Sequence, residues 1–263
     1  GLIHNDFSIN AAPISQKGPL YIIALCKDRI ELFNTESETP FTDPESIPLE
    51  DGFAGKLKDF KVADFNGDSL KDFVFSTPFE KKSLWVRFQT DETTFGPMHS
   101  FDLDKYRSLE LYDTEGNGRP ELFFIQTISG RVIMSKYTHR EREGSLLRFR
   151  PPVFYPYPSA ESKQRDLSLG DINNDGRTDV VITEPDISAV STFIQNPHYH
   201  FNRFNIFPSL VNAKTILVRN ILKATGNEML VFSEEENIIG ISTPGPDFTP
   251  SFPSPVKNIQ GEV

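Results

Sequence analysis

The sequence has few of the features that mark several large classes of protein. Cys26 is the only cysteine among 263 residues, which excludes an internal disulfide framework and a cysteine-based zinc site. The longest mainly apolar run covers residues 20–26, far short of the roughly 20 residues that span a bilayer. Positive charge is also scarce, because 27 Lys and Arg face 37 Asp and Glu for a net charge of −10. That deficit argues against nucleic acid or an anionic membrane surface as a main partner.

Signals for helices are nearly absent as well. The charged stretch 139–143 is the one candidate, and it fits a solvated loop between two strands better. By contrast, the chain has 23 Phe and 20 Pro but one Trp and three Met. Phe favours strands and Pro favours turns, so this balance indicates many short strands. An apolar content of 37% with 24% charged residues is typical of a globular protein.

A unit of about 50 residues recurs along the chain. Short apolar strands that follow turn-like stretches begin at residues 20, 72, 121, 179 and 228. Each is followed by a polar turn, a second strand-like run and a looser segment with Phe and Pro. A preceding strand is visible at residues 57–63 and 166–169. About four strands in a unit of this length is typical of a β-propeller blade.

We therefore predict an all-β fold, a β-propeller of five blade units in a single domain. A pair of β-sandwiches is the alternative fold for the same strand content. The predicted units cover residues 1–52, 53–104, 105–160, 161–211 and 212–263.

Three of the turns share a pattern of oxygen-bearing side chains. In nine-residue loops at 64–72, 113–121 and 171–179, such side chains occupy positions 1, 3, 5 and 9, and position 7 can add a backbone carbonyl. Alternate residues of a tight loop aim their oxygens at one centre, and Ca²⁺ takes six to eight oxygen ligands. The pattern therefore predicts up to three structural Ca²⁺ ions. The predicted ligands are Asp64, Asn66, Asp68, Leu70 and Asp72; Asp113, Glu115, Asn117, Arg119 and Glu121; and Asp171, Asn173, Asp175, Arg177 and Asp179.

Two other interpretations of these loops differ in how well they fit. An EF-hand needs a bidentate Glu at position 12, where this chain has Phe75, Phe124 and Ile182. A solvated turn of Asp, Asn and Gly without any metal remains the alternative for each loop. It is strongest for the middle loop, where Glu115 is longer than the usual Asp or Asn and Pro120 stiffens the exit.

The corresponding turns of the outer units have lost this chemistry. Positions 1, 3 and 5 are Ala12, Ile14 and Gln16 in the first unit, and Asn220, Leu222 and Ala224 in the last. Neither set can form a cage of oxygens, so packing alone is expected to hold these two blades.

The three loops resemble the calcium loops of integrin α-subunits and of the broader FG-GAP/VCBS repeat family. The resemblance rests on residues 64–72 and 171–179, each followed by an apolar strand, with Glu115 and Glu121 as departures. Phe95-Gly96-Pro97 is similar to the family's Phe-Gly element. The resemblance implies a propeller, most often seven-bladed, in which the calcium loop joins the first two strands of a blade. Five units are fewer than that, so this is either a compact or open assembly of five units or, as we expect, part of a longer propeller.

Two further segments are candidate binding sites. His198 and His200 would place two imidazoles on one face of an extended segment, although an exposed loop is the simpler interpretation. The aromatic segment 149–157 is either a ligand-stacking surface or an outer strand with its loop. No serine-nucleophile elbow, phosphate-binding glycine loop or His-Glu-x-x-His motif occurs, so no catalytic residue is predicted.

The sequence thus predicts a calcium-stabilised binding or scaffold module for a protein or glycan ligand. Because calcium is millimolar outside the cytoplasm, we expect a periplasmic, cell-surface or secreted location. The alternative is a carbohydrate-active lyase or hydrolase, since propellers also carry active sites. Nine of the 37 acidic residues are predicted ligands, and three bound Ca²⁺ would change the net charge from −10 to −4.

Overall fold

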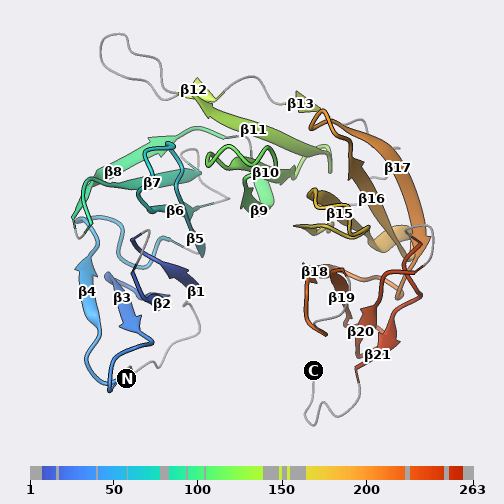
Figure 1. Ribbon diagram of the computed structural model, residues 1–263, viewed down its shortest axis with the longest axis horizontal. Helices are drawn as coiled ribbons and strands as arrows, with labels where there is room; N and C mark the ends of the chain where they lie inside the picture. The colour runs from blue at the N-terminus through green and yellow to red at the C-terminus, as the bar shows by residue number, and fades with distance from the viewer. Residues whose placement is uncertain are drawn as a thin grey trace. The chain divides into compact units, whose positions relative to one another are not determined.

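Five antiparallel β-sheets follow one another along the chain, which has the all-β architecture of a β-propeller (Figure 1). The computed structural model describes residues 8–15, 18–39, 41–57, 59–77, 83–92, 94–103, 105–138, 148–149, 153–154, 164–222, 226–245 and 249–256. Within this part of the chain, the only helical segment is a single 3-10 turn, Pro185–Ile187. The predicted fold class is confirmed, and the paired β-sandwich alternative is wrong.

Each sheet is one blade, and its strands are paired in chain order. Blade 1 contains β1 (Ser8–Pro13), β2 (Leu20–Leu25), β3 (Arg29–Asn34) and β4 (Glu45–Pro48). Blade 2 contains β5 (Asp59–Ala63), β6 (Asp72–Ser76), β7 (Leu84–Gln89) and β8 (Phe95–Phe101). Blade 4 contains β14 (Leu167–Gly170), β15 (Asp179–Glu184), β16 (Ala189–Gln195) and β17 (Phe201–Pro208). Blade 5 contains β18 (Thr215–Arg219), β19 (Glu228–Ser233), β20 (Ile238–Ser242) and β21 (Ser254–Pro255).

Blade 3 is the least regular sheet. It contains β9 (Tyr106–Tyr112), β10 (Glu121–Gln126) and β11 (Val132–Thr138), and two short strands pair with different parts of β11. These are β12 (Arg148–Phe149) and β13 (Val153–Phe154). The predicted loop at 139–143 lies outside the described residues, as does most of the aromatic segment 149–157.

Contacts between Cα atoms divide the chain into two compact units. One unit comprises residues 1–106, 116–121 and 135–151, and the other comprises residues 107–115, 122–134 and 152–263. Blades 1 and 2 belong to the first unit, and blades 4 and 5 belong to the second. Residues of blade 3 contribute to both.

In the first unit, blades 1 and 2 pack face to face through an apolar core. Ile23 and Leu25 of β2 and Ile30 of β3 join Phe73 and Phe75 of β6 in one buried cluster. The first strands of the two blades, β1 and β5, are also in contact. Alternate residues of a strand point to opposite faces of its sheet, so one face of each blade supplies this core.

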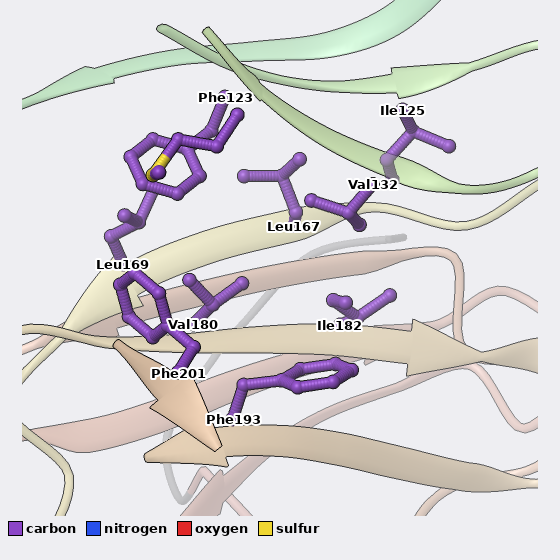
Figure 2. Packing of buried hydrophobic residues seen from close by; sticks show 10 residues of the cluster. Phe123, Ile125, Val132, Leu167, Leu169, Val180, Ile182, Phe193 and Phe201 are labelled. Atoms are coloured by element: carbon purple, nitrogen blue, oxygen red, sulfur yellow. The ribbon is translucent and has the colours of Figure 1, made fainter. Parts of the chain in front are cut away.

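In the second unit, both faces of blade 4 are buried. Val180 and Ile182 point into a cluster with Phe123 and Ile125 of β10 (Figure 2). Val181, between them in β15, belongs to a second cluster with residues of blade 5. Burial on both faces explains why Val180, Val181 and Ile182 are all apolar, without polar alternation, before the strand ends at Thr183 and Glu184.

The described residues contain no helix that is long and apolar enough to cross a bilayer.

Candidate calcium loops

Each candidate loop joins the first two strands of its blade. The loop at 64–72 connects β5 to β6, the loop at 113–121 connects β9 to β10, and the loop at 171–179 connects β14 to β15. In all three, position 9 is the first residue of the second strand. The last predicted ligand is therefore anchored in the sheet, and the other side-chain ligands precede it.

The first aspartate of the loop at 64–72 organises the backbone around itself. Asp64 Oδ1 accepts hydrogen bonds from the backbone N–H groups of Gly67, at 2.7 Å, and Asp68, at 3.0 Å. Its Oδ2 accepts a third bond from the Ser69 N–H at 2.8 Å. Asp64 itself is buried. One carboxylate thus holds three consecutive amides in a tight coil.

The loop at 171–179 repeats this arrangement in blade 4. Asp171 Oδ1 accepts the Asp175 N–H at 3.1 Å, and Oδ2 accepts the Gly176 N–H at 2.8 Å. At position 3, Asn173 accepts the Asp175 N–H with Oδ1 and donates from Nδ2 to Asp175 Oδ2. Asn66 makes the same two bonds with Asp68 in blade 2. The two loops are therefore alike in their hydrogen bonding as well as in their sequence.

The backbone conformation is common to all three loops. Positions 4 and 6 have positive φ in each, although the residue types differ: Gly67 and Ser69, Gly116 and Gly118, Asn174 and Gly176. In each loop the side chain at position 5 also accepts the N–H of position 7 at 2.9 Å. Positive φ at two alternate residues coils the chain tightly, and glycine or asparagine adopts it at the lowest cost.

The position-9 aspartates connect their loops to the rest of the blade. Asp72 Oδ2 accepts the Phe65 N–H at 2.8 Å, and Oδ1 accepts the Gln89 N–H at 2.9 Å. Asp179 binds in the same way to Ile172, at 3.1 Å, and to Gln195, at 3.0 Å. Each carboxylate thereby joins its own loop to the end of the third strand of its blade.

Burial shifts the protonation equilibrium of both aspartates. The side chains of Asp72 and Asp179 are fully buried. Loss of water raises the pKa of Asp72 to about 7, although hydrogen bonds from the Gln89 and Phe65 amides oppose the shift. The pKa of Asp179 rises to about 7 for the same reason, against bonds from Gln195 and Ile172. A cation placed beside either carboxylate would favour its ionised form.

The middle loop differs from the other two at position 9. Glu121 is buried, and its Oε1 lies 3.5 Å from Lys136 Nζ. Asp113 and Glu115 are half-buried, whereas Asn117 and Arg119 are exposed. A lysine beside the last carboxylate partly supplies the positive charge that an ion would otherwise bring.

The donor set of each loop fits Ca²⁺ by its chemistry, because it consists of hard oxygens only. In the loops at 64–72 and 171–179 these oxygens accept bonds mainly from backbone amides, and Asp175 Oδ2 is also paired with the Arg177 guanidinium at 2.5 Å. Nowhere in the described ranges do three His, Cys, Asp or Glu side chains converge as metal ligands. Calcium binding would therefore exchange some amide contacts for contacts to the ion.

Two glutamines and one glutamate make hydrogen bonds to these loops or to the equivalent turn, and the sequence analysis did not identify them as site residues. Gln89 and Gln195 end the third strands of blades 2 and 4, 17 and 16 residues after Asp72 and Asp179. The presence of a Gln at nearly the same distance after each position-9 aspartate is the sequence signal that could have identified them. In blade 5, Glu228 Oε2 accepts the N–H groups of Ile221 and Leu222, at 2.7 and 3.2 Å. A buried acid at position 9 thus caps its turn even where positions 1, 3 and 5 have lost their ligands.

The histidine pair lies in an exposed turn, as the simpler interpretation predicted. Asn196 Oδ1 accepts the backbone N–H groups of His198, at 2.8 Å, and His200, at 3.1 Å. Tyr199 between them has a φ of 60°, so the segment is not extended and the hypothesis of two imidazoles on one strand face fails.

Five blade-type sheets with loops between their first two strands define the class of this protein, a β-propeller. No protein-family model matches the sequence, and no curated protein matches it either. Solved structures share the fold. A lectin from Agrocybe aegerita that recognises non-reducing terminal N-acetylglucosamine has a TM-score of 0.67 and 15% identity, over 97% of this chain and 67% of the lectin.

Two candidate 6-phosphogluconolactonases from Bacteroides have the same fold. The Bacteroides fragilis protein has a TM-score of 0.53 and 13% identity, over 92% of this chain and 68% of its own. The Bacteroides uniformis protein has a TM-score of 0.50 and 12% identity, over 95% of this chain and 76% of that protein. At these identities the likeness shows the fold alone.

Proposed function

We propose that this protein is a calcium-stabilised, extracytoplasmic β-propeller of the FG-GAP/VCBS type that serves as a non-enzymatic glycan- or protein-binding module. The observation that carries the proposal is the repetition of one loop in blades 2 and 4. Residues 64–72 and 171–179 place the same side-chain types at the same positions, with the same kind of amide bonds. A turn selected only for its bend does not need three carboxylates and an amide at fixed positions.

The proposed ion contacts are those of an oxygen cage. In blade 2 they come from Asp64, Asn66, Asp68 and Asp72 with the Leu70 carbonyl. In blade 4 they come from Asp171, Asn173, Asp175 and Asp179 with the Arg177 carbonyl. In blade 3 they come from Asp113, Glu115, Asn117 and Glu121 with the Arg119 carbonyl. Bound Ca²⁺ would supply positive charge between carboxylates that otherwise repel one another, and would thereby stabilise the start of each blade.

Similarity to a lectin fold supports the choice of a glycan as the first ligand to test. The Agrocybe aegerita lectin aligns with 97% of this chain and recognises terminal N-acetylglucosamine. An extracytoplasmic location follows from the calcium proposal, because weak calcium sites fill only where free calcium is millimolar. A protein ligand is the competing outcome.

Thermal unfolding with and without calcium tests the structural role of the ion. Free ligand at 100 times its Kd stabilises a folded protein by about 2.7 kcal/mol, which raises the Tm of a chain of this size by roughly 5–10 °C. The double variant Asp64→Ala/Asp171→Ala should lose most of that rise, and Mg²⁺ should not reproduce it. Equal midpoints in calcium and in chelator would contradict the proposal.

Binding to immobilised glycans tests the recognition role. We expect saturable binding to glycans that end in N-acetylglucosamine, and weaker binding when chelator removes calcium. Galactose-terminated glycans on the same support are the control. If the calcium-loaded protein binds neither glycan, the glycan assignment is contradicted. A protein ligand is then the alternative to test.

A further inference from the structure

Gln195 occupies an unusual position at the end of β16. It is 1% exposed, and it is the last residue of a strand in which every residue is buried. The pairing between β16 and β17 shifts register between Ile194 and Gln195, so a β-bulge separates Gln195 from the regular ladder. Bulges re-aim a side chain or backbone group away from the regular strand. Here the bulge lies beside the loop at 171–179.

The backbone of Gln195 holds that loop at two points. Its N–H donates to Asp179 Oδ1 at 3.0 Å, and its C=O accepts from Arg177 Nε at 3.1 Å. Asp179 and Arg177 are positions 9 and 7 of the loop, both of which are proposed calcium contacts. Any adjustment of these two residues on ion binding is therefore transmitted to Gln195.

The side chain of Gln195 reaches the middle loop in the preceding blade. Its Nε2 donates to the backbone carbonyl of Thr114 at 3.0 Å, across 81 positions of sequence. Thr114 is buried and lies between Asp113 and Glu115, the first two proposed ligands of the middle loop. The bond fixes the Thr114–Glu115 peptide, which carries the Glu115 side chain.

We propose that Gln195 is a positioning residue that couples calcium occupancy of the loop at 171–179 to that of the middle loop at 113–121. The inference rests on the proposed function, and it adds that two calcium loops of neighbouring blades fill cooperatively. Ion binding at 171–179 orders Asp179 and Arg177, both of which are hydrogen-bonded to the backbone of Gln195. The side chain of Gln195 in turn fixes the peptide that precedes Glu115. By thermodynamic linkage, calcium bound to the middle loop must change the calcium affinity of the loop at 171–179 by the same factor as the reverse.

Blade 2 supplies a matched control. Gln89 also ends a third strand at a β-bulge, is 1% exposed, and donates its N–H to the position-9 aspartate, Asp72. Its side chain, however, turns back to its own loop, where Oε1 accepts the Lys71 N–H at 2.8 Å. Among the described residues, Gln89 Nε2 has no hydrogen-bond partner. Gln89 therefore shares with Gln195 the N–H contact to the position-9 aspartate and a second contact to its own loop, although a different one, and its side chain bonds to that loop and not to a second candidate loop.

Calcium titrations followed by ¹⁵N–¹H correlation spectra test the coupling. The amide of Gly176 reports occupancy of its loop, and Asp113→Ala disables the middle loop. In the otherwise unchanged protein, Asp113→Ala should raise the calcium midpoint at Gly176 about fivefold, the size expected for one hydrogen bond. In the Gln195→Met background the same substitution should change the midpoint less than about twofold. In the Gln89→Met background the roughly fivefold effect should persist.

The outcomes are separable. If Gly176 in the unsubstituted protein does not respond to calcium, the proposed function fails, and the coupling falls with it. If Gly176 responds but Asp113→Ala has the same effect with and without Gln195, the coupling alone is overturned. Gln195→Asn provides a second variant should Gln195→Met unfold, because it keeps the amide but is one methylene too short to reach Thr114. Decoupling by either folded variant supports the proposal.

Discussion

The side chain of Arg119 lies directly against Gly67, so that a residue of the middle loop covers the loop at 64–72. A Cβ atom on Gly67 would collide with Nε, Cγ and Cδ of Arg119. Gly67 also has a φ of +79°, which L-residues rarely adopt. The backbone conformation therefore favours glycine at this position, and a side chain there would also require the exposed Arg119 side chain to shift.

Gly67→Ala should therefore destabilise the protein more than Gly116→Ala. Both replace a glycine of positive φ at position 4, at a shared cost of about 1 kcal/mol, but the space around Gly116 is open. We expect an additional cost of about 0.5 kcal/mol for Gly67→Ala, because the exposed Arg119 side chain has to move aside. Urea unfolding measures both variants. The double variant Gly67→Ala/Arg119→Ala should recover the additional cost, and equal losses for the two single variants would refute the close contact.

Position 6 offers a pair of opposite substitutions. Ser69 has a φ of 76°, whereas the equivalent Gly176 has a φ of 80° and would leave an added Cβ atom with no neighbour within 4 Å. Gly176→Ser should cost about 1 kcal/mol of unfolding free energy, because only the backbone strain is added. Ser69→Gly should stabilise by up to about the same amount, less the extra chain entropy of glycine. Chemical unfolding in chelator measures both changes without interference from calcium.

The buried aspartates predict a pH dependence of stability. The folded pKa of Asp72 and of Asp179 is about 7, above the ordinary value of 3.8. Well below pH 3.8 both aspartates are protonated in the folded and in the unfolded protein, so neither group opposes folding. As pH rises from about 4 to 7 the unfolded chain releases these protons first, and stability falls. A shift of about three units corresponds to at most roughly 4 kcal/mol for each group.

Asp72→Asn isolates this contribution in the presence of chelator. Between pH 4 and 7 its unfolding free energy should decline less steeply than that of the unsubstituted protein. Saturating calcium should also flatten the decline in the unsubstituted protein, because a cation favours the ionised carboxylate. Parallel pH profiles for the two proteins in chelator would show that Asp72 is not responsible.

Equivalent positions in blades 4 and 5 should differ in their tolerance to truncation. Val181 and Leu230 are both the third residue of their blade's second strand, and they pair with Thr192 and Ile241. Val181 is fully buried, whereas Leu230 is half-buried. Val181→Ala should cost about 2 kcal/mol, and Leu230→Ala should cost less although it removes more atoms. Guanidinium unfolding measures the loss of unfolding free energy for each variant. A larger loss for Leu230→Ala than for Val181→Ala would contradict the prediction.

Much of the architecture follows from local patterns. The second strands begin at Leu20, Asp72, Glu121, Asp179 and Glu228, where the repeat placed them. Such strands are predictable because turn residues and apolar runs act over a few neighbouring positions. The positive φ at Gly67 and Gly176 was likewise foreseeable from residue type. Neither the partners of Asp72 and Asp179 nor the capping by Glu228 could be predicted, since their geometry depends on where each loop is held.

By itself, the sequence determined the all-β blade repeat and the three loops with oxygen-bearing side chains at positions 1, 3, 5 and 9. Both are encoded by spacing within a few tens of residues. Only the tertiary structure decided that Gln195 meets Thr114 and that Arg119 covers Gly67. These pairs are far apart in the chain, and blade packing brings them together. No local preference specifies such contacts, because they arise from the closure of one sheet onto the next.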